Sequence, residues 1–309
     1  MRELPVSPRS SAAPAGGSAP EIALGTVQFG MAYGITGAAK VPACDVRSIL
    51  AAAHECGVRM IDTAPGYGDI EERLVGLFPP GAAFSITSKI AALPKEYLQA
   101  HSDAKSVAQH IEEQILRSAQ HLRGFLQTML FHRAEDLESP MGEVIWQAAA
   151  ATARRLGVRL GVSIYDVHRL PPCCVGTGLD AIQCPANVFD QRLLDSDLAA
   201  RTEVHARSIF LQGLLLMDRA TAASRLPAAA TALSRWERWC HERNLSPLAA
   251  SLGFAKSLPV RFCVLGVDSP EHFSEVAAAW SAAAALPAAE LAVNALSVID
   301  PREWPRRPS

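Results

Sequence analysis

The chain has 309 residues, a formal net charge of −2 and 49% hydrophobic residues, which is enough for one large core or two ordinary ones. Its average Gly and Pro contents exclude a low-complexity chain, and its near-neutral charge gives no reason to expect nucleic acid or an anionic membrane as a partner. The Ala-rich region 276–298 is interrupted by Pro287 and Glu290, so it indicates helices rather than a membrane span.

The seven cysteines are typical of a reduced, cytoplasmic protein. Their number is odd, they form no C-x-x-C pair, and we see no secretory leader. Cys173 and Cys174 are adjacent, but no suitably placed further ligands accompany them. We therefore predict neither a disulfide framework nor a metal site.

We interpret both ends of the chain as tails outside the folded domain. Residues 1–20 contain Pro, Ser, Gly and Ala in irregular order and no apolar run long enough for a signal peptide, so we expect a disordered segment. Residues 301–309 carry three arginines, Arg302, Arg306 and Arg307, which we interpret as a solvated C-terminal tail.

Between the tails, short apolar runs alternate with amphipathic segments of period near 3.6. The apolar runs predict strands at Glu21–Gly25, Val58–Thr63, Phe84–Lys89, Leu126–Phe131, Arg159–Ser163, Leu179–Gln183, Glu203–Arg207 and Phe262–Gly266. The amphipathic segments predict helices at Asp45–Cys56, Ile70–Leu77, Asp103–Leu122, Gly142–Leu156, Ala228–Arg243, Pro247–Leu258, Pro270–Ala285 and Ala288–Leu296.

This alternation predicts an α/β fold. Strands without polar alternation should be buried on both faces, as in a parallel sheet covered by helices. Eight such units in about 280 residues fit a (β/α)₈ TIM barrel. A doubly wound open sheet is the competitor, but the segment Gly25–Gly30 after the first strand does not fit G-x-G-x-x-G. With no dividing linker, we predict a single-domain (β/α)₈ barrel over residues 21–300.

Polar residues follow the predicted strands. The second strand ends in IDTAPGYG at 61–68, which alone reads equally well as a surface turn. In a barrel, however, the carboxyl ends of the strands form the active face, so residues far apart in sequence meet there. The residues at these ends are Asp62, Lys89, His132, Ser163, Gln183, Arg207 and Ser208.

Four residues at this face make a chemical set. Tyrosine has a reference pKa near ~10, and a neighbouring ammonium lowers it by favouring the phenolate. We expect Lys89 to do this for Tyr67, while Asp62 keeps the buried ammonium charged. His132 can donate a hydrogen bond to a carbonyl oxygen beside Tyr67. Such a set protonates an oxygen while hydride reaches carbon, and the hydride requires a nicotinamide cofactor.

With these residues, the chain resembles the aldo-keto reductase family from about residue 21 to 290. The matching segments are LGTVQFG at 24–30, IDTAPGYG at 61–68, TSK at 87–89, FHR at 131–133, LGVSIYD at 160–166, IQCPANVFDQR at 182–192, RSIFLQGLL at 207–215 and LGVDSPEHFSE at 265–275. The resemblance implies a barrel that binds NADP(H) or NAD(H) without a Rossmann domain. It also implies a catalytic tetrad in which Tyr67 is general acid in reduction and general base in oxidation, with Asp62, Lys89 and His132.

The resemblance also implies a set of cofactor contacts. Ser163 and Gln183 should hold the nicotinamide carboxamide, the loop after the seventh strand should wrap the pyrophosphate, and the segment after the eighth should grip the adenosine. The implied positions are Gly25, Thr26, Asp62, Ser163, Gln183, Arg207, Ser208, Phe210, Gly213, Gly266, Ser269, Glu271 and Glu275.

Three positions depart from the family pattern. Ile164 stands where many members have Asn, and Arg207 aligns with an aromatic residue that lies under the nicotinamide. A guanidinium there can stack on a flat ring, or bind the pyrophosphate or an anionic substrate. Asp268 stands near the expected place of the 2′-phosphate of NADP, which it would repel, so NAD and NADP both stay open. The branch is similar to relatives found with bacterial surface-sugar synthesis, which implies polyhydroxylated substrates.

The leading hypothesis is an NAD(P)-dependent oxidoreductase that interconverts an aldehyde, ketone or sugar carbonyl and an alcohol. One alternative is a non-catalytic cofactor-binding sensor or accessory subunit on the same fold. Another is an isomerase or lyase that uses Lys89 as a Schiff base. Met31, Tyr33 and Phe131 fit either an apolar substrate mouth or the core. We expect a monomer or weak oligomer.

Overall fold

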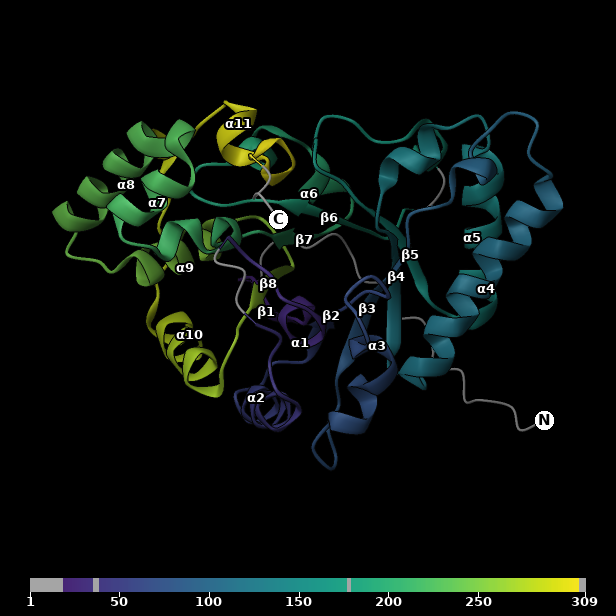
Figure 1. The fold of residues 1–309 in the computed structure, drawn as a ribbon, viewed down its shortest axis with the longest axis horizontal. Helices are drawn as coiled ribbons and strands as arrows, with labels where there is room; N and C mark the ends of the chain where they lie inside the picture. The colour runs from purple at the N-terminus through teal and green to yellow at the C-terminus, as the bar shows by residue number, and fades with distance from the viewer. Residues whose placement is uncertain (1–18, 36–38, 177–178, 306–309) are drawn as a thin grey trace.

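Eight parallel strands close into a barrel in the computed structural model, which describes residues 19–35, 39–176 and 179–305 (Figure 1). Their order around the ring follows the sequence, and β1 pairs with both β2 and β8. The strands are β1 Glu21–Gly25, β2 Met60–Asp62, β3 Ser85–Ile90, β4 Leu126–Phe131, β5 Arg159–Ser163, β6 Ala181–Pro185, β7 Glu203–Arg207 and β8 Phe262–Gly266. The predicted (β/α)₈ barrel is therefore confirmed.

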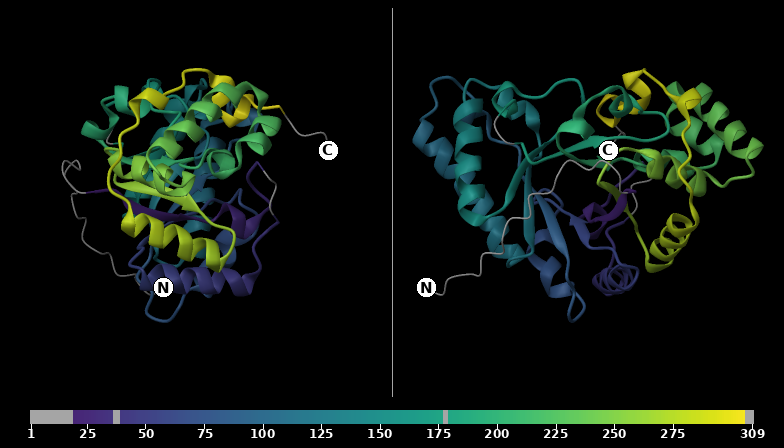
Figure 2. Two further views of the ribbon diagram at one scale, coloured as in Figure 1. Left: turned by 90° about the vertical axis from the view of Figure 1, so that its left-hand side faces the viewer. Right: turned by 180° about the vertical axis from the view of Figure 1, so that it is seen from behind.

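Helices surround the barrel, with α4 and α5 at one end of the long axis and α7 and α8 at the other (Figure 1), and α2 beside α10 (Figure 2). The α-helices are α1 Val27–Gly30, α2 Ala43–Glu55, α3 Ile70–Arg73, α4 Ala104–Leu122, α5 Gly142–Leu156, α6 Leu198–Arg201, α7 Arg219–Arg225, α8 Ala230–Glu242, α9 Pro247–Ser257, α10 Pro270–Ala282 and α11 Leu296–Ile299. Short 3₁₀ helices are η1 Leu74–Leu77, η2 Lys95–Tyr97, η3 Ala134–Glu138, η4 Pro172–Cys174, η5 Arg192–Asp195, η6 Leu211–Leu216, η7 Pro227–Ala229, η8 Ala289–Leu291 and η9 Pro301–Glu303. No helix in the described ranges is both long and apolar enough to cross a bilayer.

The long helix α4 shows how local sequence places these elements. Val107, Ile111 and Ile115 are fully buried and recur at the helical period, so they form the stripe that faces the barrel. The Asp103 carboxylate accepts the Ser106 backbone N–H and caps the first turn. The helix ends at Arg123, whose φ of 48° is left-handed.

The strand register collects polar side chains at one end of the barrel interior. Gly25 lies beside Asp62 on one side and beside Gly266 on the other. Because alternate residues of a strand share a face, the inward layer below this level holds apolar Ala23, Met60 and Phe262. The inward residues at the carboxyl end are Gly25, Asp62, Lys89, Ser163, Gln183, Arg207 and Gly266.

The structure corrects one predicted helix. No helix was predicted between β5 and β6 or between β6 and β7, and the described residues there hold η4 in the first segment and η5 and α6 in the second. The predicted helix 288–296 is wrong, since η8 gives way to extended chain before α11. There the Val293 N–H donates to the Phe189 carbonyl at 2.9 Å, so a tertiary hydrogen bond replaces a helical one.

Arg302, predicted to lie in a solvated tail, is exposed but makes several contacts with the barrel. Its guanidinium pairs with Asp300 at 2.7 Å and Glu135 at 3.0 Å, and it stacks on the Tyr165 ring at 3.6 Å. The Trp304 indole N–H donates to the Val298 carbonyl at 3.2 Å. Residues 301–304 are thus packed onto the barrel. The other two predicted tail arginines, and residues 1–18 of the predicted N-terminal tail, lie outside the described residues.

Candidate active site

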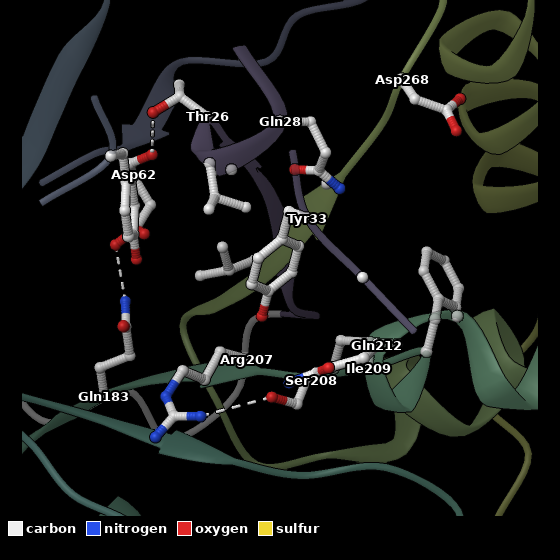
Figure 3. A pocket seen from close by; sticks show the side chains of 18 of the residues that line it. Thr26, Gln28, Tyr33, Asp62, Gln183, Arg207, Ser208, Ile209, Gln212 and Asp268 are labelled. Carbon is white, nitrogen blue, oxygen red and sulfur yellow. Dashed lines mark hydrogen bonds between the residues drawn. The ribbon is translucent and has the colours of Figure 1, made fainter. Parts of the chain in front are cut away.

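A cavity of about 370 Å³ opens at the carboxyl end of the barrel (Figure 3). It collects most of the sequence-predicted residues, and Lys89 lies buried directly beneath it, in contact with the Tyr67 ring. The predicted residues that line it are Gly25, Thr26, Asp62, Tyr67, His132, Ser163, Gln183, Arg207, Ser208, Phe210, Gly213 and Gly266.

A buried ion pair forms the floor of the cavity. The Lys89 ammonium, 1% exposed, donates to Asp62 Oδ1 at 2.7 Å and to the Thr63 carbonyl at 3.0 Å. The second Asp62 oxygen accepts the Gln183 amide at 2.7 Å. Burial lowers the pKa of Lys89, but Asp62 and Tyr67 more than offset this, and the pKa lies above its ordinary value. Lys89 is therefore charged at neutral pH.

The phenol of Tyr67 lies against this pair, with the Lys89 ammonium 5.1 Å from the ring centre. The expected net lowering of the Tyr67 pKa is wrong. Burial raises the pKa of Tyr67 above 10.0, the charge of Asp62 adds to the rise, and the Lys89 ammonium offsets only part of it. Tyr67 consequently holds its proton at neutral pH.

His132 stands edge-on to Tyr67, with ring centres 5.8 Å apart and planes at 86°. Burial and the nearby positive charge of Lys89 lower the pKa of His132 to about 4. The imidazole is therefore neutral at physiological pH, and one ring nitrogen carries a proton that it can donate to a bound oxygen.

Two glycines fix the turn that carries Tyr67. A Cβ on Gly30 would lie 1.5 Å from the Tyr67 carbonyl oxygen, and one on Gly68 would lie 2.4 Å from the Gly30 carbonyl oxygen. Gly68 also has a φ of 69°, which L side chains rarely adopt. The loop after β1 and the Tyr67 turn thus touch backbone to backbone, which only glycine permits.

We predict that Gly30→Ala lowers kcat by about 10- to 100-fold, because the two backbones must separate and misplace the Tyr67 hydroxyl. Gly76→Ala is the matched control, since no atom lies within 4 Å of a Cβ added there. Steady-state kinetics and thermal unfolding of both variants test this. Wild-type kcat in Gly30→Ala would show that the contact does not position Tyr67.

The loop after β7 lines the cavity in an unusual backbone conformation. Ser208, Leu211, Gln212 and Gly213 all have φ between 47° and 92°, and successive turns of this kind form concave anion-binding surfaces. The Leu211 and Gly213 N–H groups donate within the loop, to the Ser208 and Phe210 carbonyls, so the N–H groups of Ser208 and Gln212 are the ones that fit the phosphates of a nicotinamide dinucleotide. The Ile35 N–H donates to the Gln212 carbonyl at 3.0 Å, so the loops after β1 and β7 are joined across the cavity.

A second feature also fits a dinucleotide. Gln28 points into the cavity, and its Oε1 is buried without a hydrogen-bond partner in the described residues (Figure 3). A Cβ on Gly266 would come within 2.5 Å of the Gln28 amide, so glycine there makes room for this side chain. An unpartnered buried amide is costly, which indicates that Gln28 pairs with a bound polar ligand.

The segment after β8 is the one predicted to grip the adenosine of the cofactor. Ser269 accepts the His272 N–H at 3.0 Å as the cap of α10, Glu271 and Glu275 are exposed, and none of the three predicted residues lines the cavity. Asp268 and His272 line it instead, paired at 2.8 Å.

Sequence reasoning placed some cavity residues and missed others. Tyr33 lines the cavity, whereas Phe131 packs on Trp146 in the core and Met31 is exposed outside the lining. The glycine-bounded loops after β1 and β7 were the available signal for most of the others, which are Val27, Gln28, Gly34, Ile209, Gln212 and Leu216. Tyr165, after β5, and Val264, within β8, also line the cavity and had no such signal. No group of three or more potential metal ligands occurs in the described part of the chain.

The sequence model of the Aldo/keto reductase family matches residues 21–292, so the chain belongs to the aldo-keto reductase family. Enzymes of this family use NAD(P)(H). No curated protein matches the chain.

Solved structures share the fold at low identity. The glycerol dehydrogenase of Gluconobacter oxydans is 20% identical over 93% of this chain and 94% of its own, with a TM-score of 0.61. A mutant of Gox0644 in complex with NADPH is 15% identical over 88% and 89%, with a TM-score of 0.61. An aldo-keto reductase from a Medee basin deep-sea metagenome is 16% identical over 89% and 90%, with a TM-score of 0.57.

Proposed function

We propose that the protein is an NAD(P)(H)-dependent oxidoreductase that interconverts a carbonyl group and an alcohol. The observation that carries this proposal is the buried Lys89–Asp62 pair beneath Tyr67, with neutral His132 beside it at the end of one cavity. The substrate is a small aldehyde, ketone or sugar. The glycerol dehydrogenase and the NADPH complex among the structural neighbours support this substrate class and cofactor.

In the reducing direction, the neutral His132 N–H and the Tyr67 hydroxyl both donate to the carbonyl oxygen. A nicotinamide held by Ser163 and Gln183 would supply the hydride for the carbonyl carbon. The Tyr67 proton passes to the oxygen, which leaves an alcohol and a phenolate that the Lys89 ammonium stabilises. In oxidation each transfer runs backwards, and the phenolate is the base.

The lining of the cavity supports a set of proposed cofactor-binding roles. Ser163 and Gln183 hold the carboxamide, Gly25, Thr26 and Gly266 line the nucleotide path, and Ser208, Phe210 and Gly213 surround the pyrophosphate. Asp268, close to the adenosine end, favours the free ribose hydroxyls of NAD over the 2′-phosphate of NADP. We further propose a cytoplasmic monomer or weak oligomer.

A panel of aldehydes, ketones and sugars, assayed with NADH and with NADPH by the absorbance of the reduced cofactor, tests the function. Turnover of one class is expected, with a preference for NADH. A clear preference for NADPH would refute the Asp268 argument, and no turnover with saturable cofactor binding would favour the sensor alternative. Borohydride trapping of substrate on Lys89 would reveal a Schiff base, which a charged Lys89 disfavours.

The pH profile should differ between directions. Reduction needs protonated Tyr67, with a pKa raised above 10.0, and neutral His132, with a pKa of about 4, so its kcat/KM should stay nearly flat between these limits. Oxidation needs the phenolate, so its rate should climb as pH rises toward 10. Rate profiles in both directions measure this. If kcat/KM for reduction fell as the pH was lowered through ~6.5, and His132→Gln removed this fall, His132 would titrate as an exposed histidine does, which would contradict a buried, neutral His132.

A further inference from the structure

Arg207, at the end of β7, is a cation of the cavity without a counter-ion among the described residues. It donates from Nη2 to the Ile164 carbonyl at 3.2 Å and from Nη1 to the Ser208 hydroxyl at 3.3 Å. A guanidinium carries five N–H donors, so three donors of Arg207 have no partner in the described part of the chain.

The other charges at the reacting end of the cavity are matched. Lys89 pairs with Asp62 at 2.7 Å, and Asp268, which follows β8, is hydrogen-bonded to His272 at 2.8 Å. His132 is neutral because its pKa lies at about 4. Among the described residues, the catalytic end therefore carries one uncompensated positive charge, on Arg207. This charge would attract an anion, and the attraction would offset the free energy of desolvating that anion.

Stacking holds the Arg207 guanidinium in place. Its centre lies 4.1 Å from the Tyr165 ring, and Arg302 lies 3.6 Å from the same ring. Arg302 is fixed in turn by Asp300 and Glu135. The ring of Tyr165 thus contacts one face of the Arg207 guanidinium, and two of its nitrogens are hydrogen-bonded. Its remaining N–H donors therefore have a fixed geometry, which suits a carboxylate or phosphate.

Arg207 faces the reacting end of the cavity. Arg207 lines the same cavity as Tyr67 and His132, and its positive charge contributes to lowering the pKa of both. The Tyr33 hydroxyl points toward Arg207 and Ser208 from the opposite wall (Figure 3). Tyr33 is 37% exposed at the cavity wall, and a tyrosine hydroxyl with its ordinary pKa near ~10 is protonated at neutral pH and can donate to an anion.

We propose that Arg207 binds an anionic group of the carbonyl substrate, so that the enzyme prefers aldehydes, ketones or sugars that carry a carboxylate or a phosphate. This inference rests on the proposed function for its turnover assay. The pyrophosphate of the cofactor is the other source of an anion, and the experiment separates the two.

The test compares succinic semialdehyde with butyraldehyde, which differ mainly in the terminal carboxylate. The wild type should favour the acid by about tenfold or more in kcat/KM, chiefly through KM. Arg207→Gln should abolish this ratio, and Arg207→Lys should keep part of it, because lysine keeps the charge without the planar fork. Arg155→Gln, which removes an exposed guanidinium paired with Glu112 outside the cavity lining, is the control and should keep the ratio.

Binding supplies a readout without turnover. By calorimetry with saturating cofactor, γ-hydroxybutyrate should bind the wild type and lose about tenfold or more in affinity in Arg207→Gln, while butanol should not change. If no carbonyl is turned over but this difference holds, the proposed function fails and the anion site stands. An unchanged ratio in Arg207→Gln overturns the inference. So does weaker dinucleotide binding without a change in ratio, since Arg207 would then face the cofactor.

Discussion

Replacing Tyr67 with phenylalanine should lower turnover by about 10³-fold or more, within the range known for loss of a general acid. The substitution removes one hydroxyl and keeps the ring that packs edge-on against His132, so the fold and the cavity wall should persist. Cofactor affinity should change little, because in this proposal the hydroxyl serves the carbonyl oxygen and the nucleotide path is lined by other residues.

Single-turnover kinetics, cofactor titration and thermal unfolding of Tyr67→Phe measure these expectations. Tyr97→Phe is a matched control, because the Tyr97 ring packs on His110, 4.7 Å between centres, and does not line the cavity. If Tyr67→Phe kept a tenth or more of the wild-type rate, Tyr67 would not be the proton donor.

Lys89→Met should both inactivate and destabilise the protein. It leaves Asp62 buried with only Gln183 as a side-chain partner, and an uncompensated buried charge costs about 3–5 kcal/mol. Turnover should fall by about 10²-fold or more, because no ammonium then stabilises the phenolate of Tyr67.

A double variant separates the two effects. Asp62→Asn with Lys89→Met removes both charges, so it should recover most of the free energy of unfolding while activity stays lost. Arg155→Met is the control for loss of an exposed ion pair, here with Glu112, and should cost less than about 1 kcal/mol. Urea titrations and steady-state assays give both quantities. If Lys89→Met and Arg155→Met lowered the free energy of unfolding by the same amount, the buried Lys89–Asp62 ion pair would not have the proposed energetic role.

The strands could be predicted closely from the sequence. Arg159–Ser163, Glu203–Arg207 and Phe262–Gly266 have the predicted bounds, because short apolar runs between glycines and turns have few alternatives to a buried strand. The segment 288–296 could not be predicted, since its Ala-rich composition favours a helix and its hydrogen bond to Phe189 depends on the assembled barrel.

The positions of the site residues could be predicted from the sequence, but their pKa values could not. A barrel rim explains why Asp62 and His132 meet. The raised pKa of Tyr67 was not foreseen, because the extent of burial follows from packing that a sequence does not display. The left-handed conformations of Ser208, Leu211 and Gln212 could not be predicted from the sequence either, since these residue types rarely adopt them.

The closed ring also constrains how the molecule is made. Glu21 and Arg261 form a salt bridge and a hydrogen bond across the β1–β8 seam although 240 residues separate them. A nascent chain therefore leaves the ribosome with β1 unmatched on one edge until nearly everything downstream has been synthesised. Such high contact order implies slow folding, with β8 as the last strand to dock, and a message shortened before codon 262 would yield only an open, aggregation-prone sheet.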